Sequence, residues 1–235
     1  MLQPRIVCRV TSGSWSREDC YMNLAEFTKY LFERPTDGLE WYFRDEHEDP
    51  SVAKELLVEL VAGVFMQAAS IGSQFSERQV CMGLRYLVNP SSGPIAYRYL
   101  DASIDFEVRK WAIASMRFVF SDLFAQKLEG NGAYREHGGL PLSYGETCYM
   151  WWDMFPRHGI PRRADMEDVD SVICQTIGSV LEVDVLACQE SALHGLGHWF
   201  SSRPDEVETA VKSFLPRAPF ALQQYAFEAM QGLVQ

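Results

Sequence analysis

The hydrophobic positions along the chain recur at helical spacing over most of its length. Between residues 52 and 69, apolar residues come in pairs every four positions, which predicts an amphipathic helix that starts near Asp49. Ser76 and Gln79 form a capping-box pattern for a second helix that runs to Val88. These two segments together predict a helical hairpin.

Further helical patterns cover most of the remaining chain. The longest predicts a central helix over residues 105–128, with apolar side chains on most of its faces. Four more helices are predicted, over residues 165–181, 188–200, 205–215 and 221–233. Strand patterning is limited to residues 5–10, and a lone strand cannot form a sheet. The predicted class is therefore all-α.

Four of the predicted helices share a short pattern of one polar, one variable, one small and one large apolar residue. The pattern occurs at residues 79–82, 110–113, 190–193 and 224–227. Its spacing fits one helix pair per repeat if the middle interval holds two units. A four-helix bundle does not require a pattern that repeats at this period. A single stacked helical solenoid over residues 1–235 is therefore favoured.

A glycine-rich segment, residues 130–148, interrupts the helical patterns. It has five glycines and one proline and shows neither a helical nor a strand period, which is typical of a binding loop or a mobile loop. It leads into CYMWWDMFP, the densest aromatic cluster of the chain. Trp151 and Trp152 there could present a binding surface or fill the core, and Asp153 and His158 could satisfy their polar groups.

The segment CQESALHGLGHW holds the strongest candidate for chemistry. Glu190, His194 and His198 are four residues apart and lie opposite the apolar stripe of the predicted helix. Two histidines at this spacing can share a metal ion, but Glu190 and His198 are ~12 Å apart along the axis, too far to bind one ion. A third ligand would have to be remote in sequence, such as Asp153 or His158.

The residues between the two histidines weaken the case for catalysis. A zincin protease has its general-base Glu directly after the first His, and Gly195 and Gly197 flank Leu196 here instead. The favoured interpretation is therefore structural, with Glu190 hydrogen-bonded to His194 and with no catalytic residue, metal ligand or cofactor. Each glycine costs ~1 kcal/mol relative to alanine in a helix, so a close contact with a neighbouring helix is expected.

Composition narrows the classes of partner. The 235 residues include 32 acidic and 21 basic side chains, a net charge of −11, which argues against binding to nucleic acid or to anionic membranes. The sequence has no export signal pattern and no ~20-residue apolar span. Six cysteines are scattered singly, so reduced thiols in a cytoplasmic protein are expected.

Three strings, GETCYMWWDMFP, ESALHGLGHW and LQQYAFEAMQGLV, resemble a group of bacterial proteins with HEAT-like helical repeats. The likeness covers mainly residues 145–234. It implies a curved stack of antiparallel helix pairs and, usually, a protein-binding role. It brings no catalytic residues.

Two functions are therefore weighed. The leading expectation is a non-enzymatic cytoplasmic protein that binds another macromolecule, such as a basic protein, through a concave helical face. The alternative is a metal-dependent enzyme that uses His194 and His198 with a remote third ligand. The candidate binding residues are Glu190, His194, His198, Trp151, Trp152, Asp153 and His158.

Overall fold

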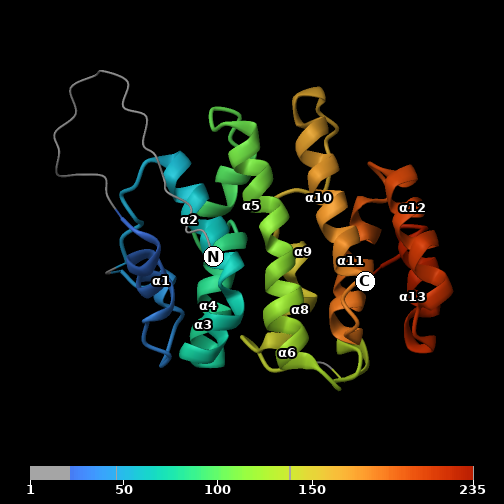
Figure 1. Cartoon of the computed structure of the whole chain (residues 1–235), viewed down its shortest axis with the longest axis horizontal. Helices are drawn as coiled ribbons and strands as arrows, with labels where there is room; N and C mark the ends of the chain where they lie inside the picture. Colours follow the sequence, from blue (N-terminus) through green and yellow to red (C-terminus); the bar gives the residue numbers. More distant parts are fainter. Residues whose placement is uncertain (1–21, 46, 138, 235) are drawn as a thin grey trace, which may run out of the picture.

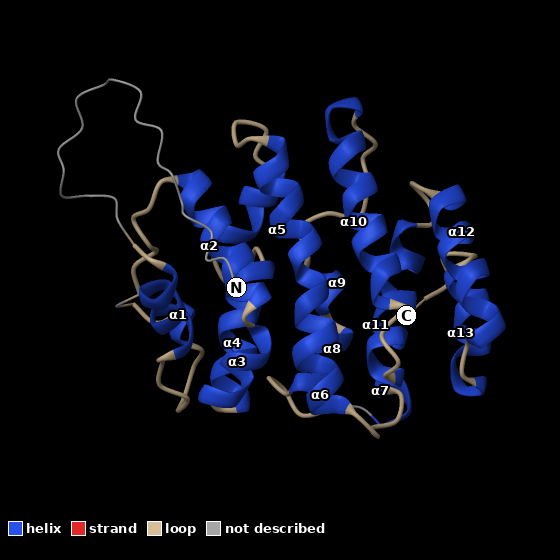
Figure 2. Ribbon diagram, viewed as in Figure 1, coloured by secondary structure: helices blue, strands red, loops and turns tan. Residues whose placement is uncertain are grey.

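The structure, a computed structural model, describes residues 22–234 apart from residues 46 and 138. Every regular element in this part of the chain is a helix, which confirms the all-α prediction (Figure 2). The predicted strand over residues 5–10 lies outside the described residues. The α-helices are α1 (Leu24–Phe32), α2 (Lys54–Met66), α3 (Ala68–Gln74), α4 (Glu77–Val88), α5 (Phe106–Phe118), α6 (Ala125–Leu128), α7 (Tyr134–His137), α8 (Tyr144–Tyr149), α9 (Trp151–Met154), α10 (Glu167–Val180), α11 (Leu186–Trp199), α12 (Pro204–Phe214) and α13 (Phe220–Ala229).

The first predicted hairpin is confirmed in part. The backbone N–H of Ser76 donates to the Gln79 side chain, and the Ser76 hydroxyl accepts from the Gln79 backbone N–H, so the capping box begins α4 as expected. The single helix predicted over residues 52–69 is wrong, because the chain bends by 71° between α2 and α3. The apolar pattern continues through the break at Gln67 and therefore does not reveal it.

The predicted central helix is confirmed as one continuous stretch. The Asp105 carboxylate caps α5 by accepting hydrogen bonds from the backbone N–H groups of Glu107 and Val108. A π-helical stretch, Val119–Phe124, then joins α5 to α6 without a break in the helical backbone. Its buried side chains lie at the centre of the molecule, where Phe120 packs against the aromatic rings of α9.

The helices lie in two layers over one connected core. In the first layer, α2 and α10 pack on either side of α5, and α12 follows α10 (Figure 1). In the second, α4 contacts α8 and α9, both of these contact α11, and α11 contacts α13. Figure 1 shows the succession from α1 at one end of the long axis to α12 and α13 at the other. No repeat or solenoid is detected in the described residues.

The pair α2 and α3 comes closest to the length and composition of a membrane span in the described structure. In the part of the chain that the structure describes, no single helix is long and apolar enough to span a bilayer. The bent pair α2 and α3 meets the same length and composition test only when its two helices are taken together.

The glycine-rich segment is not wholly irregular, so that prediction is wrong. It contains α7 and most of α8, two short helices whose ends are held by side chains. The Ser143 hydroxyl accepts from the backbone N–H of Glu146 and begins α8, and the buried Glu190 accepts from the backbone N–H groups at the start of α7. Helices this short show no periodicity in sequence, and they depend on such side-chain contacts, one local at α8 and one tertiary at α7.

Candidate metal centre

Two glycines allow α11 to lie against its neighbours. A Cβ atom added to Gly195 would lie 2.6 Å from Cγ of Trp152, and one added to Gly197 would lie 2.4 Å from a methyl group of Val234. Both separations are shorter than van der Waals contact, so only glycine fits without displacing the neighbour. The expected close contact with a neighbouring helix is therefore present at Gly195, where α11 lies next to α9, whereas Gly197 contacts the segment that follows α13.

This approach brings together Asp153 of α9 and the two histidines of α11. His194 Nε2 lies 3.1 Å from His198 Nε2 and 3.0 Å from one carboxylate oxygen of Asp153. The other carboxylate oxygen lies 2.6 Å from His198 Nε2. Two ligand atoms bound to one zinc ion at ~2.0–2.1 Å in tetrahedral geometry are ~3.3 Å apart, close to the two spacings at His194 Nε2, and His198 and Asp153 would separate slightly to admit the ion. We call these three residues the Asp–His–His cluster.

The cluster has a buried end and an open end. The His194 side chain is 3% exposed, whereas the Asp153 and His198 side chains are 24% and 33% exposed. His194 is thus enclosed by the protein, while the other two residues reach solvent. An ion held by the three side chains would keep positions open on the solvent side, as catalytic metal ions with three protein ligands do.

The charges within the cluster favour an ionised carboxylate. Burial raises the pKa of Asp153, but hydrogen bonds to His194 and His198 and electrostatic attraction to the same two side chains outweigh it and hold that pKa below its ordinary value. The short separation of the two Nε2 atoms also requires at least one of them to present a lone pair rather than a hydrogen. The cluster therefore offers an anionic oxygen and imidazole nitrogen lone pairs, which are the donors that transition metals bind.

Two tyrosines contact the opposite nitrogen of His194. Tyr225 Oη of α13 lies 2.5 Å from His194 Nδ1, and Tyr149 Oη of α8 lies 3.2 Å from the same atom. Burial raises the pKa of both tyrosines, so the phenols stay protonated. When Nε2 binds an ion, Nδ1 must carry the hydrogen and donate to a phenol oxygen, which fixes the tautomer and the ring orientation.

Glu190 does not contact the cluster, so the prediction that it forms a hydrogen bond with His194 is wrong. The fully buried Glu190 carboxylate accepts instead from the backbone N–H groups of Tyr134 and Arg135. Burial raises the pKa of Glu190, and these hydrogen bonds together with the Arg135 side chain oppose that rise. The Arg135 guanidinium in turn lies 3.5 Å from the ring centre of Tyr225. Glu190 therefore fixes the segment that covers the tyrosine pair.

The remaining predicted site residues lie outside the cluster. Trp151 and Trp152 are buried in the core, which favours the core interpretation of these side chains over a binding surface. The ring of His158 lies 5.2 Å from that of His198, but its Nε2 donates to the backbone carbonyl of Trp152, 2.7 Å away. His158 is therefore a neighbour of the cluster, and Asp153 is the remote residue that joins the two histidines.

Sequence reasoning did not place Tyr149 and Tyr225 beside His194. Tyr149 falls in the aromatic run before α9, and Tyr225 falls in the short pattern at residues 224–227. Neither position shows in sequence that its hydroxyl meets an imidazole, because the contact joins α8, α11 and α13. Only the packing of these three helices reveals it.

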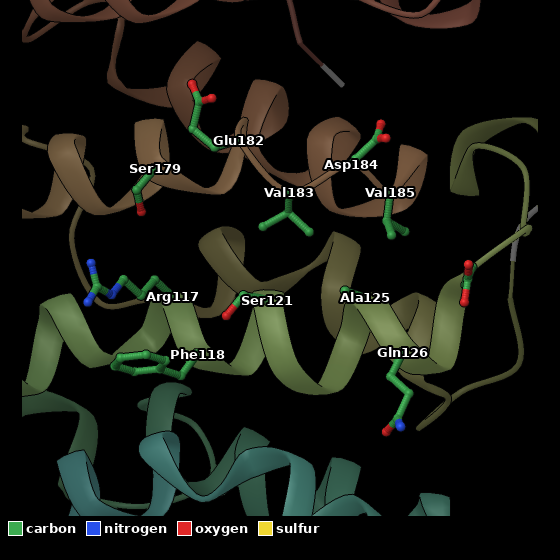
Figure 3. Close-up of a pocket in the computed structure, with 11 residues that line it drawn as sticks. Arg117, Phe118, Ser121, Ala125, Gln126, Ser179, Glu182, Val183, Asp184 and Val185 are labelled. Carbon is green, nitrogen blue, oxygen red and sulfur yellow. The ribbon is translucent and has the colours of Figure 1, made fainter.

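The described structure also contains a cavity that lies away from the Asp–His–His cluster. It has a volume of about 870 Å³ between the α5–α6 stretch and the connection from α10 to α11 (Figure 3). Arg117, Glu182 and Asp184 line it together with the apolar side chains of Phe118 and Val183. None of the seven predicted site residues lines this cavity. The Asp–His–His cluster is therefore the better candidate for chemistry.

Comparison with known proteins identifies no family for this chain. The resemblance to bacterial HEAT-like proteins is supported only as far as the all-helical class. No family model, no curated protein and no solved structure matches the chain.

Proposed function

We propose that this chain is a metal-dependent enzyme whose divalent metal ion is held by Asp153, His194 and His198. The observation that carries the proposal is the convergence of one carboxylate and two Nε2 atoms, all within 4.8 Å of one another, from two separate helices. From the sequence alone, this function is the alternative to binding of another macromolecule. The geometry favours it because the third ligand lies within reach of both histidines.

The donor set indicates which ions fit. Two imidazoles and one carboxylate suit zinc in sites of catalytic type and ferrous iron in sites with open positions. Either ion would act as a Lewis acid, polarising a bound substrate group and activating a water molecule. The chain contributes a buried His194 that orients the site and an exposed side through which water and substrate reach it.

The proposal is tested by titrating the metal-free full chain with Zn²⁺, Fe²⁺ and Mg²⁺ in a calorimeter. We expect one Zn²⁺ or Fe²⁺ ion per chain and far weaker binding of Mg²⁺, because imidazole nitrogen is a poor ligand for that hard cation. Equal affinity for all three ions, or no binding, would contradict the proposal.

The tyrosine contacts give a second, independent prediction. Tyr225→Phe removes the hydroxyl that lies 2.5 Å from His194 Nδ1 and leaves the buried ring in place. We expect Zn²⁺ affinity to fall ~10–100-fold, the usual cost of losing a partner that orients a metal-bound histidine. Tyr99→Phe is the matched control. Tyr99 is also buried, but its hydroxyl donates to the backbone carbonyl of Leu87, which is not part of the Asp–His–His cluster. A Tyr225→Phe affinity equal to that of the control would contradict the orienting role.

The finer fold assignment and the binding role remain proposals. We infer that the two layers form a HEAT-like stack of antiparallel pairs, supported by the contacts of α5 with α2 and α10 and of α11 with α9 and α13. Binding of a basic protein partner is supported by the net charge of −11 alone. A partner search at micromolar protein that finds none would count against that role.

A further inference from the structure

A cleft of about 530 Å³ opens beside the Asp–His–His cluster. One wall is the turn that follows α4, with Asn89 and Ser91, and the other is the segment that follows α9, with His158. Asp153 belongs both to this cleft and to the cluster, and the ring of His158 lies 5.2 Å from the ring of His198. An ion held by the cluster would therefore lie at the edge of the cleft.

The positive charge in this cleft is already neutralised. Arg157 is the one arginine or lysine among the described residues that line it. Its Nη2 donates to Asp170 at 2.6 Å, its Nε donates to the other oxygen of the same carboxylate, and both side chains are buried. Its Nη1 and Nη2 atoms also lie 3.4 and 3.5 Å from the carbonyl oxygen of Pro161. A phosphate or carboxylate group in the cleft would find no available guanidinium.

The polar groups that line the cleft suit a neutral ligand. Because a carbonyl oxygen only accepts hydrogen bonds, His158 Nε2 donates to the Trp152 carbonyl, 2.7 Å away. The Asn89 side-chain oxygen accepts from the Ser91 backbone N–H at 2.9 Å, which leaves the amide NH₂ group as a donor. Apolar side chains, including Ile160, complete the lining.

From this lining we infer that the cleft binds the organic substrate of the metal site, and that this substrate is an uncharged amide. The inference rests on the proposed metal site, since the ion would bind the carbonyl oxygen while the Asn89 amide in the cleft donates a hydrogen bond to the rest of the molecule. The reaction is then hydrolysis. A water oxygen bonds to the carbonyl carbon, the C–N bond breaks, and a water proton passes to the departing nitrogen, which gives a carboxylic acid and an amine.

The test uses three probes that share one metal-binding group. Benzohydroxamate, 4-acetamidobenzohydroxamate and 4-carboxybenzohydroxamate are titrated into the Co²⁺-loaded full chain, and binding is followed by the visible absorption of the cobalt ion. We expect the acetamido probe to bind about tenfold more tightly than the carboxy probe, because the cleft offers hydrogen bonds to an amide and no countercharge to an anion. Equal binding, or tighter binding of the carboxy probe, would overturn the inference.

A variant in the cleft separates this inference from the metal site itself. Ser91→Trp places a large side chain on the exposed wall of the cleft and leaves all three metal-binding residues unchanged, so we expect acetamido probe affinity to fall about tenfold while Co²⁺ affinity stays unchanged. Ser73→Trp, at an exposed position of α3, is the control and should change neither affinity. Unchanged probe binding in Ser91→Trp overturns the cleft inference alone. Failure of the wild-type chain to bind Co²⁺ overturns the proposed metal site, and the inference with it.

Discussion

His198→Ala is expected to lower the affinity of the chain for Zn²⁺ by more than about 100-fold, because loss of a ligand exceeds the ~10–100-fold cost of losing an orienting partner. The substitution removes the Nε2 atom that lies 2.6 Å from Asp153 and 3.1 Å from His194. Since His198 is one-third exposed, the change leaves little unfilled space in the core. Calorimetric titration of the metal-free variant, with circular dichroism to verify folding, measures the effect.

His158→Ala is the matched control for this variant. It also removes an imidazole, from a ring that lies 5.2 Å from that of His198, but His158 is not part of the Asp–His–His cluster. We expect its Zn²⁺ affinity to stay close to that of the wild type. If the two alanine variants lose affinity equally, His158 is a ligand as well, and the assignment of Asp153, His194 and His198 as the whole ligand set fails.

The second large effect concerns the aromatic core beneath the cluster. Trp152→Ala is expected to lower the free energy of unfolding by about 3–5 kcal/mol, the usual cost of truncating a buried large aromatic side chain. The Trp152 side chain is 1% exposed and stacks on Phe120 with ring centres 5.7 Å apart. It also lies against Gly195 of α11, so its loss leaves a cavity between α9 and the helix that carries both histidines.

Urea denaturation of the metal-free proteins measures this effect. Trp111→Ala is the control, because Trp111 is a tryptophan of α5 that is 44% exposed, and we expect it to cost much less. A Trp152→Ala variant as stable as the Trp111→Ala variant would show that the α9–α11 contact is not part of the core.

Local patterns in the sequence were enough to predict most of the long helices. The capping box at Ser76 and Gln79 uses side chains within three residues of the backbone groups they bind, so sequence spacing reveals it. The short helices α7, α8 and α9 were not predicted. The start of α7 depends on the distant Glu190, and all three helices have too few residues to show a period.

The candidate site was predictable only in part, for the same reason. The spacing of His194 and His198 placed both histidines on one helix face, and Asp153 was one of two remote ligands considered. The choice between Asp153 and His158 depends on how closely α9 and α11 approach, which Gly195 and Trp152 determine. Glu190 shares the helix face of the two histidines in sequence. The rise along α11 separates it from His198, however, and its carboxylate binds the start of α7 instead.

The most direct test of the metal site is anomalous X-ray scattering at the zinc absorption edge, from crystals of the full chain grown with Zn²⁺. The account predicts one strong peak about 2.0–2.2 Å from His194 Nε2, His198 Nε2 and an Asp153 carboxylate oxygen. A zinc ion bound only elsewhere on the chain, or no peak while these side chains remain hydrogen-bonded to one another, would contradict it.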